Sequence, residues 1–214
     1  MIYLIIALTF FILSIISNKI IYNLDINIDK NLSNNILILL PNMIIPILIY
    51  SKYELSVETL SYIMLIPFLT LISIIDYRTT YVYDITIVSG IIMQCVIFLV
   101  TNHFNNNSMN HLKGLLVGVV ISYIVMKITE ALGEGDIGFY GLCCFVLGVQ
   151  YSLYMMLLSS ILASLYGIYL ILTKTKSLKS SIPFTPFISL ATILVMLTES
   201  DIINFYFDIL MRNL

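Results

Sequence analysis

Long runs of Ile, Leu, Val, Phe and Met, separated by short polar stretches, limit most narrowly how this chain can fold. A helix needs roughly 20 predominantly apolar residues to cross a bilayer core about 30 Å thick. Because 60% of the residues are hydrophobic and only 10% are charged, the composition favours a polytopic membrane protein. The predicted fold is all-α, with about eight transmembrane helices. Candidate spans cover residues 2–17, 36–50, 59–75, 85–101, 112–129, 137–149, 152–172 and 183–198.

One membrane domain accommodates the whole chain. Residues 1–214 are expected to form a single transmembrane domain with its core at 59–198 and no separate soluble domain. The first run has neither the basic start nor the small-residue cleavage site of a signal peptide, so we expect it to be retained as a span. The tail from Asp201 mixes charged and aromatic residues, which favours an amphipathic helix at the membrane surface over a ninth span.

Charge and cysteine content argue against two kinds of site. The net charge is -2 and the ten Lys and Arg are scattered, so nucleic acid is not an expected partner. The three cysteines lie in apolar runs without a CxxC pair, and the chain has only two histidines. Neither a disulfide framework nor a metal site is therefore predicted. The lipid bilayer is the expected surrounding of the chain.

The distribution of Lys and Arg among the loops predicts the orientation in the membrane, because basic residues favour the inner side. With the N-terminus outside, the basic residues at inner loops and span ends are Lys19, Lys30, Arg78, Lys127, Lys174, Lys176 and Lys179. Those left outside are Lys52, Lys113 and Arg212. The N-terminus is therefore expected outside, and the 76–84 and 130–136 loops then share the cytoplasmic side.

Two aspartates stand at the ends of apolar runs. Asp76 directly follows MLIPFLTLISII, and Asp136 opens the run IGFYGLCCFVLG after GEG (133–135). An acidic group near membrane depth is costly, which makes it a candidate functional residue. Glycine reaches positive φ and permits close approach of other atoms, so a GxG step can turn the chain and aim Asp136 into a cleft. A plain helix N-cap explains Asp136 equally well and stays open as an alternative.

A pair of carboxylates that meet in a low-dielectric cleft tends to share one proton. One carboxylate can then act as base towards a water, and the other as acid towards a carbonyl oxygen. This chemistry hydrolyses a peptide bond without a metal or a covalent intermediate. An ion-coupled membrane transporter, in which the acids bind a cation, is the alternative from a different class. It would be expected to show two related halves, and the sequence shows no such symmetry.

Three motifs, in this order, resemble the type IV prepilin peptidase family of GxGD intramembrane aspartyl proteases. GEGD (133–136) matches the GxGD motif itself. IIDYRTTYVYD places Asp84 after Asp76 as in the family, with Tyr83 where the family usually has Pro. SIPFTPF (181–187) is similar to a late IPFGPF-like element of the family. Together the motifs extend over about residues 60–190.

The resemblance implies an aspartic endopeptidase of the inner cell membrane with eight spans. Such an enzyme removes the leader peptides of type IV prepilins or pseudopilins at the cytoplasmic face, cutting after a Gly. The implied catalytic pair is Asp76 and Asp136. The residues implied to shape the site are Gly133, Gly135, Pro183 and Pro186. Glu134, Glu130 and Arg78 are candidate substrate contacts, with solvated loop charges as the alternative for the acids.

The chain departs from the family in two places. Gly138 stands where many members have a Lys, so any role of that cation is absent or filled otherwise. Residues 18–35 are too short for the four-cysteine metal insertion of many bacterial members and contain no Cys. Peptidase activity alone, without a metal or cofactor, is the main expectation. A bifunctional peptidase and N-methyltransferase, which would use S-adenosylmethionine, is the alternative.

Overall fold

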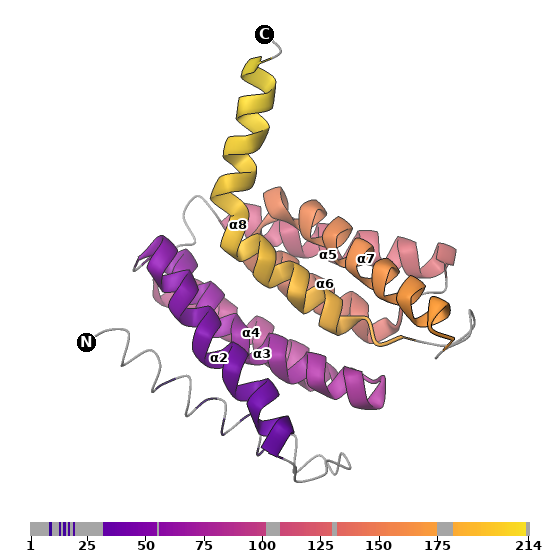
Figure 1. Cartoon of the computed structure of the whole chain (residues 1–214). Helices are drawn as coiled ribbons and strands as arrows, with labels where there is room; N and C mark the ends of the chain where they lie inside the picture. The colour runs from indigo at the N-terminus through magenta and orange to yellow at the C-terminus, as the bar shows by residue number, and fades with distance from the viewer. Residues whose placement is uncertain are drawn as a thin grey trace.

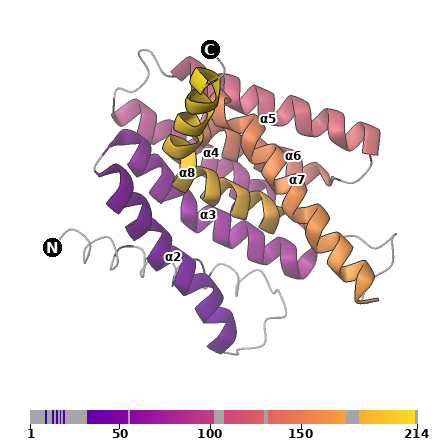
Figure 2. The same ribbon diagram turned by 45° about the horizontal axis from the view of Figure 1, so that its top comes forward.

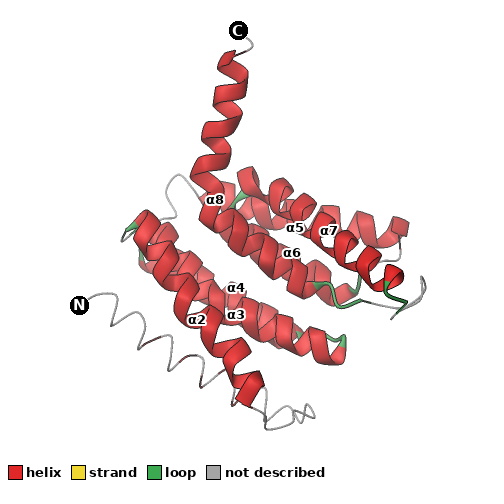
Figure 3. Cartoon of the chain, in the orientation of Figure 1, coloured by secondary structure: helices red, strands yellow, loops and turns green. Residues whose placement is uncertain are grey.

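The computed structural model describes residues 32–54, 56–101, 108–129, 132–174 and 182–212, together with Thr9, Leu13, Ile15, Ser17 and Lys19. Within these residues the chain is all-helical, with no strand (Figure 3). The helices are α2 (Leu32–Tyr53), α3 (Val57–Thr79), α4 (Asp84–Val100), α5 (Ser108–Thr129), α6 (Glu134–Leu147), α7 (Val149–Leu172) and α8 (Thr185–Arg212). They coincide in order with the candidate spans from 36–50 to 183–198. The first candidate span, 2–17, falls mostly outside the described residues.

Three of the described helices have the length and composition of membrane spans. Val57–Thr79, Met109–Thr129 and Val149–Leu172 are long and apolar enough to cross a membrane. Large apolar side chains on α4, α5 and α7 are exposed, among them Val88, Leu99, Leu116, Leu157 and Leu165. A water-soluble surface rarely carries so many. The all-α expectation is confirmed for the described residues, while eight spans and an outside N-terminus stay predictions.

The helices form two groups with the first half of α8 between them (Figures 1 and 2). One group contains α2, α3 and α4, and the other contains α5, α6 and α7. The first half of α8 packs on α3 and α7, while its second half extends beyond the bundle. The tail from Asp201 is helical and continues α8 without a break, in one helix of 28 residues. Its place at the membrane surface stays a prediction.

The short helix α6 lies at the centre of the bundle. Every residue from Phe139 to Gly148 is buried, and α6 contacts α3, α4, α5, α7 and α8. At 1.5 Å per residue its length is about 21 Å, less than a bilayer core. A Cβ on Gly114 of α5 would lie 2.3 Å from the Cys144 carbonyl oxygen, so glycine is needed for this close contact. The core of the fold therefore encloses α6.

Side chains of α5 close the carboxyl end of α6. His111 Nδ1 lies 2.9 Å from the Phe145 carbonyl oxygen, within hydrogen-bond reach. Asn110 Oδ1 accepts a hydrogen bond from the Val149 N–H at 3.2 Å. Gly148 joins α6 to α7 with φ 76°, in the left-handed region that favours glycine. The opposite end of α6, its amino end, opens to a pocket.

Candidate active site

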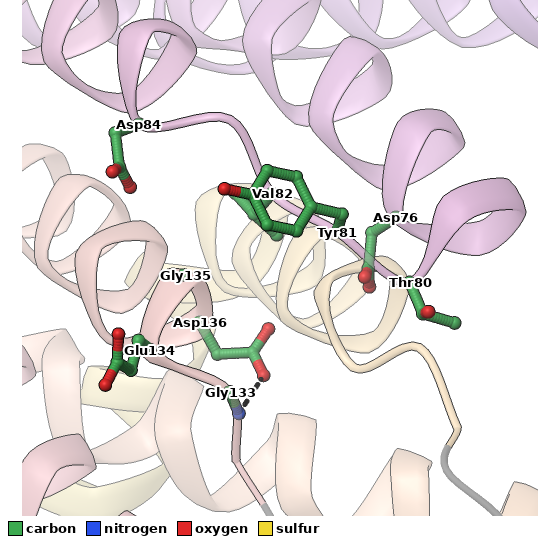
Figure 4. Close-up of a pocket in the computed structure, with 9 residues that line it drawn as sticks. All are labelled: Asp76, Thr80, Tyr81, Val82, Asp84, Gly133, Glu134, Gly135 and Asp136. Carbon is green, nitrogen blue, oxygen red and sulfur yellow. Dashed lines mark hydrogen bonds between the residues drawn. The ribbon is translucent and has the colours of Figure 1, made fainter. Parts of the chain in front are cut away.

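A pocket of about 320 Å³ lies where the ends of α3, α4 and α6 meet (Figure 4). The α3–α4 loop and the first turn of α6 form most of its wall. Four of its residues are acidic, and no Lys or Arg stands among the described residues that line it. The lining residues are Asp76, Thr80, Tyr81, Val82, Asp84, Gly133, Glu134, Gly135 and Asp136. The structure thus brings Asp76 and Asp136, far apart in the sequence, into one pocket.

Asp76 lies in the last turn of α3 and is only 5% exposed. Its Oδ2 accepts two hydrogen bonds from Thr185, one from the backbone N–H and one from the hydroxyl, each at 3.0 Å. Thr185 is the first residue of α8, where backbone N–H groups have no partner within their own helix. The carboxylate of one helix therefore caps the amino end of another.

The segment before and around Thr185 is held by aromatic contacts. The Phe184 ring lies 6.2 Å from that of Tyr140 on α6, and the Phe187 ring lies 5.3 Å from that of Tyr166 on α7. Such pairs contribute roughly 0.5–1.5 kcal/mol beyond their area burial. They fix the start of α8 against the central helix, which places the Thr185 donors beside Asp76.

Asp136 lies in the first turn of α6 and is 8% exposed. The N-cap is Gly133, and Asp136 is the third helical residue, so the alternative that Asp136 is itself the N-cap is wrong. Its Oδ2 nevertheless accepts the Gly133 N–H at 2.9 Å, as the acidic partner of a capping box does. Figure 4 shows the carboxyl groups of Asp76 and Asp136 both directed into the pocket. Capping thus occupies one oxygen of Asp136 without removing the group from the pocket.

The environment of Asp136 favours its protonated form. Burial raises the pKa of Asp136 to about 6; the hydrogen bond from Gly133 opposes this rise, and the charge of Asp76 adds to it. A carboxyl group that holds a proton close to neutral pH is suited to act as a general acid. The pocket therefore contains one acid able to donate a proton next to a second buried carboxyl.

The two glycines of GEGD differ in what they do. A Cβ on Gly135 would lie 2.6 Å from the Val82 Cβ, so the α3–α4 loop can approach α6 only because residue 135 is glycine. A Cβ on Gly133 would meet only the Asp136 Oδ2, at 3.5 Å. Gly133 has φ -79°, and neither glycine adopts positive φ. Of the two properties of glycine considered for this motif, positive φ is not used, and close approach at Gly135 is the physical reason for a glycine here.

The remaining predicted site residues differ in whether they line the pocket. Glu134 lines it and is exposed, whereas Arg78 is not among its lining residues. Glu130 lies outside the described residues. Pro183 precedes α8, and Pro186, its second residue, faces an apolar cleft between α2, α3 and α8.

Gly138 lies away from the acidic pocket. A Cβ on this residue would lie 3.0 Å from the Ile87 Cδ1 of α4. Among the described residues no group of three or more His, Cys, Asp or Glu could hold a metal ion.

Sequence reasoning did not single out Thr185 or the loop residues Thr80, Tyr81 and Val82. Thr185 stood inside the SIPFTPF motif, but nothing in the motif indicated which side chain it would contact. Thr80 adopts φ 53°, a conformation uncommon for a β-branched residue, and its N–H closes α3 on the Asp76 carbonyl oxygen at 2.7 Å. The run of polar residues after Asp76 was the available signal for this loop.

Comparison with known proteins places this site in a family. Residues 63–168, about half of the chain, match the sequence model of the type IV leader peptidase family. A stretch of 96 residues is 32% identical to the prepilin leader peptidase/N-methyltransferase of Bacillus subtilis strain 168. That stretch is 44% of this chain and 39% of the relative, so the match spans well under two thirds of the relative's length. No solved structure matches the chain.

The fold and the site define a class of protein: a bundle with membrane-length apolar helices and two buried carboxyl groups at one pocket. The chain belongs to the type IV leader peptidase family, as its three motifs predicted. Members of this family are proteases that remove leader peptides. The matched residues include Asp76 and Asp136 and end before Thr185.

Proposed function

We propose that this chain is a membrane-embedded aspartic endopeptidase that removes the leader peptides of type IV prepilins or pseudopilins. The observation that supports it best is the meeting of Asp76 and Asp136, both buried, at one pocket. One carboxylate takes a proton from a water that attacks the scissile carbonyl carbon. The other donates its proton to the carbonyl oxygen, and the tetrahedral intermediate then releases the new amino terminus.

We further propose that the enzyme lies in the cell membrane with its active site on the cytoplasmic side. Eight spans with the N-terminus outside would place the α3–α4 loop and the start of α6 on the cytoplasmic side of the cell membrane. Three membrane-length helices and the exposed apolar surface support a place in the bilayer. Cysteine substitutions at exposed Tyr81 and exposed Lys113 test the orientation by labelling with a membrane-impermeant maleimide. Labelling of the Tyr81 position from the periplasmic side of intact cells would overturn it.

The acidic rim of the pocket is proposed to contact the substrate. Glu134 is exposed at the pocket, and an acidic rim attracts Lys and Arg of a leader peptide. Glu130 and Arg78 are proposed as further contacts on sequence position alone. Charge reversal at Glu134 is expected to raise KM for a precursor with a basic leader more than it lowers kcat.

A cleavage assay tests the catalytic pair. A prepilin precursor is co-expressed with the wild type, Asp76→Asn, Asp136→Asn or Asp84→Asn, and removal of the leader is followed by gel mobility and mass. Each of the first two substitutions is expected to abolish cleavage. Asp84→Asn removes a charge from the same pocket at an exposed residue and is expected to keep most of the activity. Cleavage that survives Asp76→Asn or Asp136→Asn would overturn the pair.

The proposal assigns no methyltransferase activity and no cofactor to this chain. The relative in Bacillus subtilis is named for both activities, and the match covers 39% of it. The mass of the processed pilin terminus separates the two alternatives. An added methyl group that depends on this chain would show the bifunctional enzyme.

A further inference from the structure

The contact between Asp76 and Thr185 joins residues 109 positions apart. We propose that Thr185 is a positioning residue that keeps Asp76 ionised and oriented, so that Asp76 is the base of the pair and Asp136 is the acid. This inference rests on the proposed peptidase function and deepens it by assigning the two roles.

Thr185 offers two donors to a single oxygen of Asp76. Its N–H and its hydroxyl both reach Oδ2 at 3.0 Å, and Thr185 itself is fully buried. An ionised carboxylate only accepts hydrogen bonds, so these two donors, together with the Phe184 backbone N–H, favour the ionised form and oppose the burial of the group, which favours the protonated form. The amino end of α8 adds the positive end of its helix dipole.

The donors are held in place by further contacts between α3 and α8. The hydroxyls of Ser73 and Ser189 lie 2.5 Å apart, one turn from the Asp76–Thr185 contact on each helix. The Ser189 hydroxyl also lies 3.2 Å from the Leu69 carbonyl oxygen. Because α3 and α8 are joined at successive turns, Thr185 is fixed relative to Asp76.

Asp136 is held differently. Within the described residues its carboxyl group accepts a single hydrogen bond, the local one from the Gly133 N–H. The other titratable residues at the pocket are Asp84, Glu134 and Tyr81, all exposed, and the described start of α8 from 182 to 189 contributes none. The two buried carboxyls therefore differ chiefly in the donors that face them, which is what separates a base from an acid.

The two donors of Thr185 can be separated by substitution. Of the two donors that Thr185 offers to Asp76, the N–H belongs to the backbone and the hydroxyl belongs to the side chain. Substitutions at this residue can therefore remove the hydroxyl while the backbone donor remains.

The test measures kcat, KM and the pH dependence of cleavage for full-length protein in detergent, with purified precursor as substrate. Variants are Thr185→Val, Thr185→Ala and Thr185→Ser, with Thr192→Val as the matched control. Thr192 is equally buried on α8, but its hydroxyl donates to the Ile188 carbonyl of the same helix.

Thr185→Val and Thr185→Ala are expected to lower kcat about tenfold, the effect of about 1.4 kcal/mol, which is close to the lower end of the range for one hydrogen bond to a charged group. The low-pH limb of the plot of kcat against pH, where the base becomes protonated, is expected to move to higher pH. KM is expected to stay unchanged. Thr185→Ser and Thr192→Val should keep the wild-type values. If Thr185→Val does not fold, Thr185→Ala alone tests the role of the hydroxyl.

A Thr185→Ala enzyme with unchanged kcat and pH profile would overturn the inference, and so would equal losses for Thr185→Ala and Thr192→Val. Either result leaves the peptidase proposal standing as long as Asp76→Asn is inactive. Full activity of Asp76→Asn would instead overturn the catalytic pair itself.

Discussion

The α3–α8 contact and the first turn of α6 each hold one carboxyl group of the pocket, by different means. The position of the Asp76 carboxyl depends on Thr185, 109 residues further along the chain, and therefore on the packing of α3 against α8. The position of the Asp136 carboxyl depends on Gly133, three residues before it, and therefore on the local geometry of one turn. A long-range contact can be disturbed from anywhere along the helix interface, whereas a local turn is disturbed mainly by its own residues.

The largest effect is expected where the local turn meets the α3–α4 loop. Gly135→Ala would place a Cβ 2.6 Å from the Val82 Cβ, an atom that no rotamer change can move. The loop or the turn must shift, and a displacement of about 1 Å at a catalytic group can cost about a hundredfold in rate. The measurement is the rate of precursor cleavage, with helicity checked by circular dichroism.

Gly133→Ala is the matched control in the same motif. Its Cβ would be in ordinary contact at 3.5 Å, and its φ of -79° suits any residue, so most activity should remain. Adding Val82→Gly to Gly135→Ala should restore part of the lost rate. Equal losses for the two alanine variants would show that close approach to Val82 is not the reason for the glycine.

The next effect concerns the pH dependence of stability at Asp136. Because the pKa of this group is raised from 3.8 to about 6, the folded protein binds a proton that the unfolded chain releases. The resulting stabilisation is present below pH 4 and is lost as the pH rises through about 6, by about 3 kcal/mol at most. Melting of the wild type and of Asp136→Asn in detergent at pH 5 and pH 8 measures it. The wild type should lose more stability than the variant over this interval, and parallel changes would contradict the burial of this carboxyl.

A smaller effect is expected for Gly138→Lys, which introduces the cation that the family resemblance implies at this position. Residue 138 follows Asp136 by two positions, about 200° around the helix, so the new side chain leads towards Ile87 and away from the pocket. We expect a change in cleavage rate of about threefold or less and the same pH dependence of melting as the wild type. A shift of that pH dependence would show that the cation reaches Asp136.

The smallest effect is expected for Ser189→Ala on the long-range side of the comparison. It removes the hydrogen bond to Ser73 and the contact with the Leu69 carbonyl, and such bonds between membrane helices average about 0.6 kcal/mol. Melting should drop slightly, with kcat lowered less than by Thr185→Ala. A loss of kcat as large as that of Thr185→Ala would show that the whole interface, and not the Thr185 donors, controls Asp76.

Sequence alone predicted the helices because each needs only a local apolar run and polar residues at its ends. It also predicted the first turn of α6 as the place for Asp136, since a capping pattern involves neighbouring residues. The Thr185 contact could not be predicted, because hydropathy does not indicate which helices pack together or in which register. The enclosure of α6 escaped prediction for the same reason: a lipid-facing run and a buried run have equal hydropathy. Gly114 and Gly118 of α5 both approach Cys144 of α6 so closely that an added Cβ would clash, a contact that hydropathy does not indicate.

The capping of the start of α8 by Asp76 also sets an order in time. At roughly 5–20 residues per second, a ribosome needs several seconds to add the 109 residues that separate Asp76 from Thr185. Over the last 49 of those residues, from Asp136 to Thr185, the nascent chain already has both aspartates but lacks the donors that fix the first. The complete pocket forms only after α8 has emerged and inserted, so a growing chain does not yet have the arrangement proposed to cut its substrates.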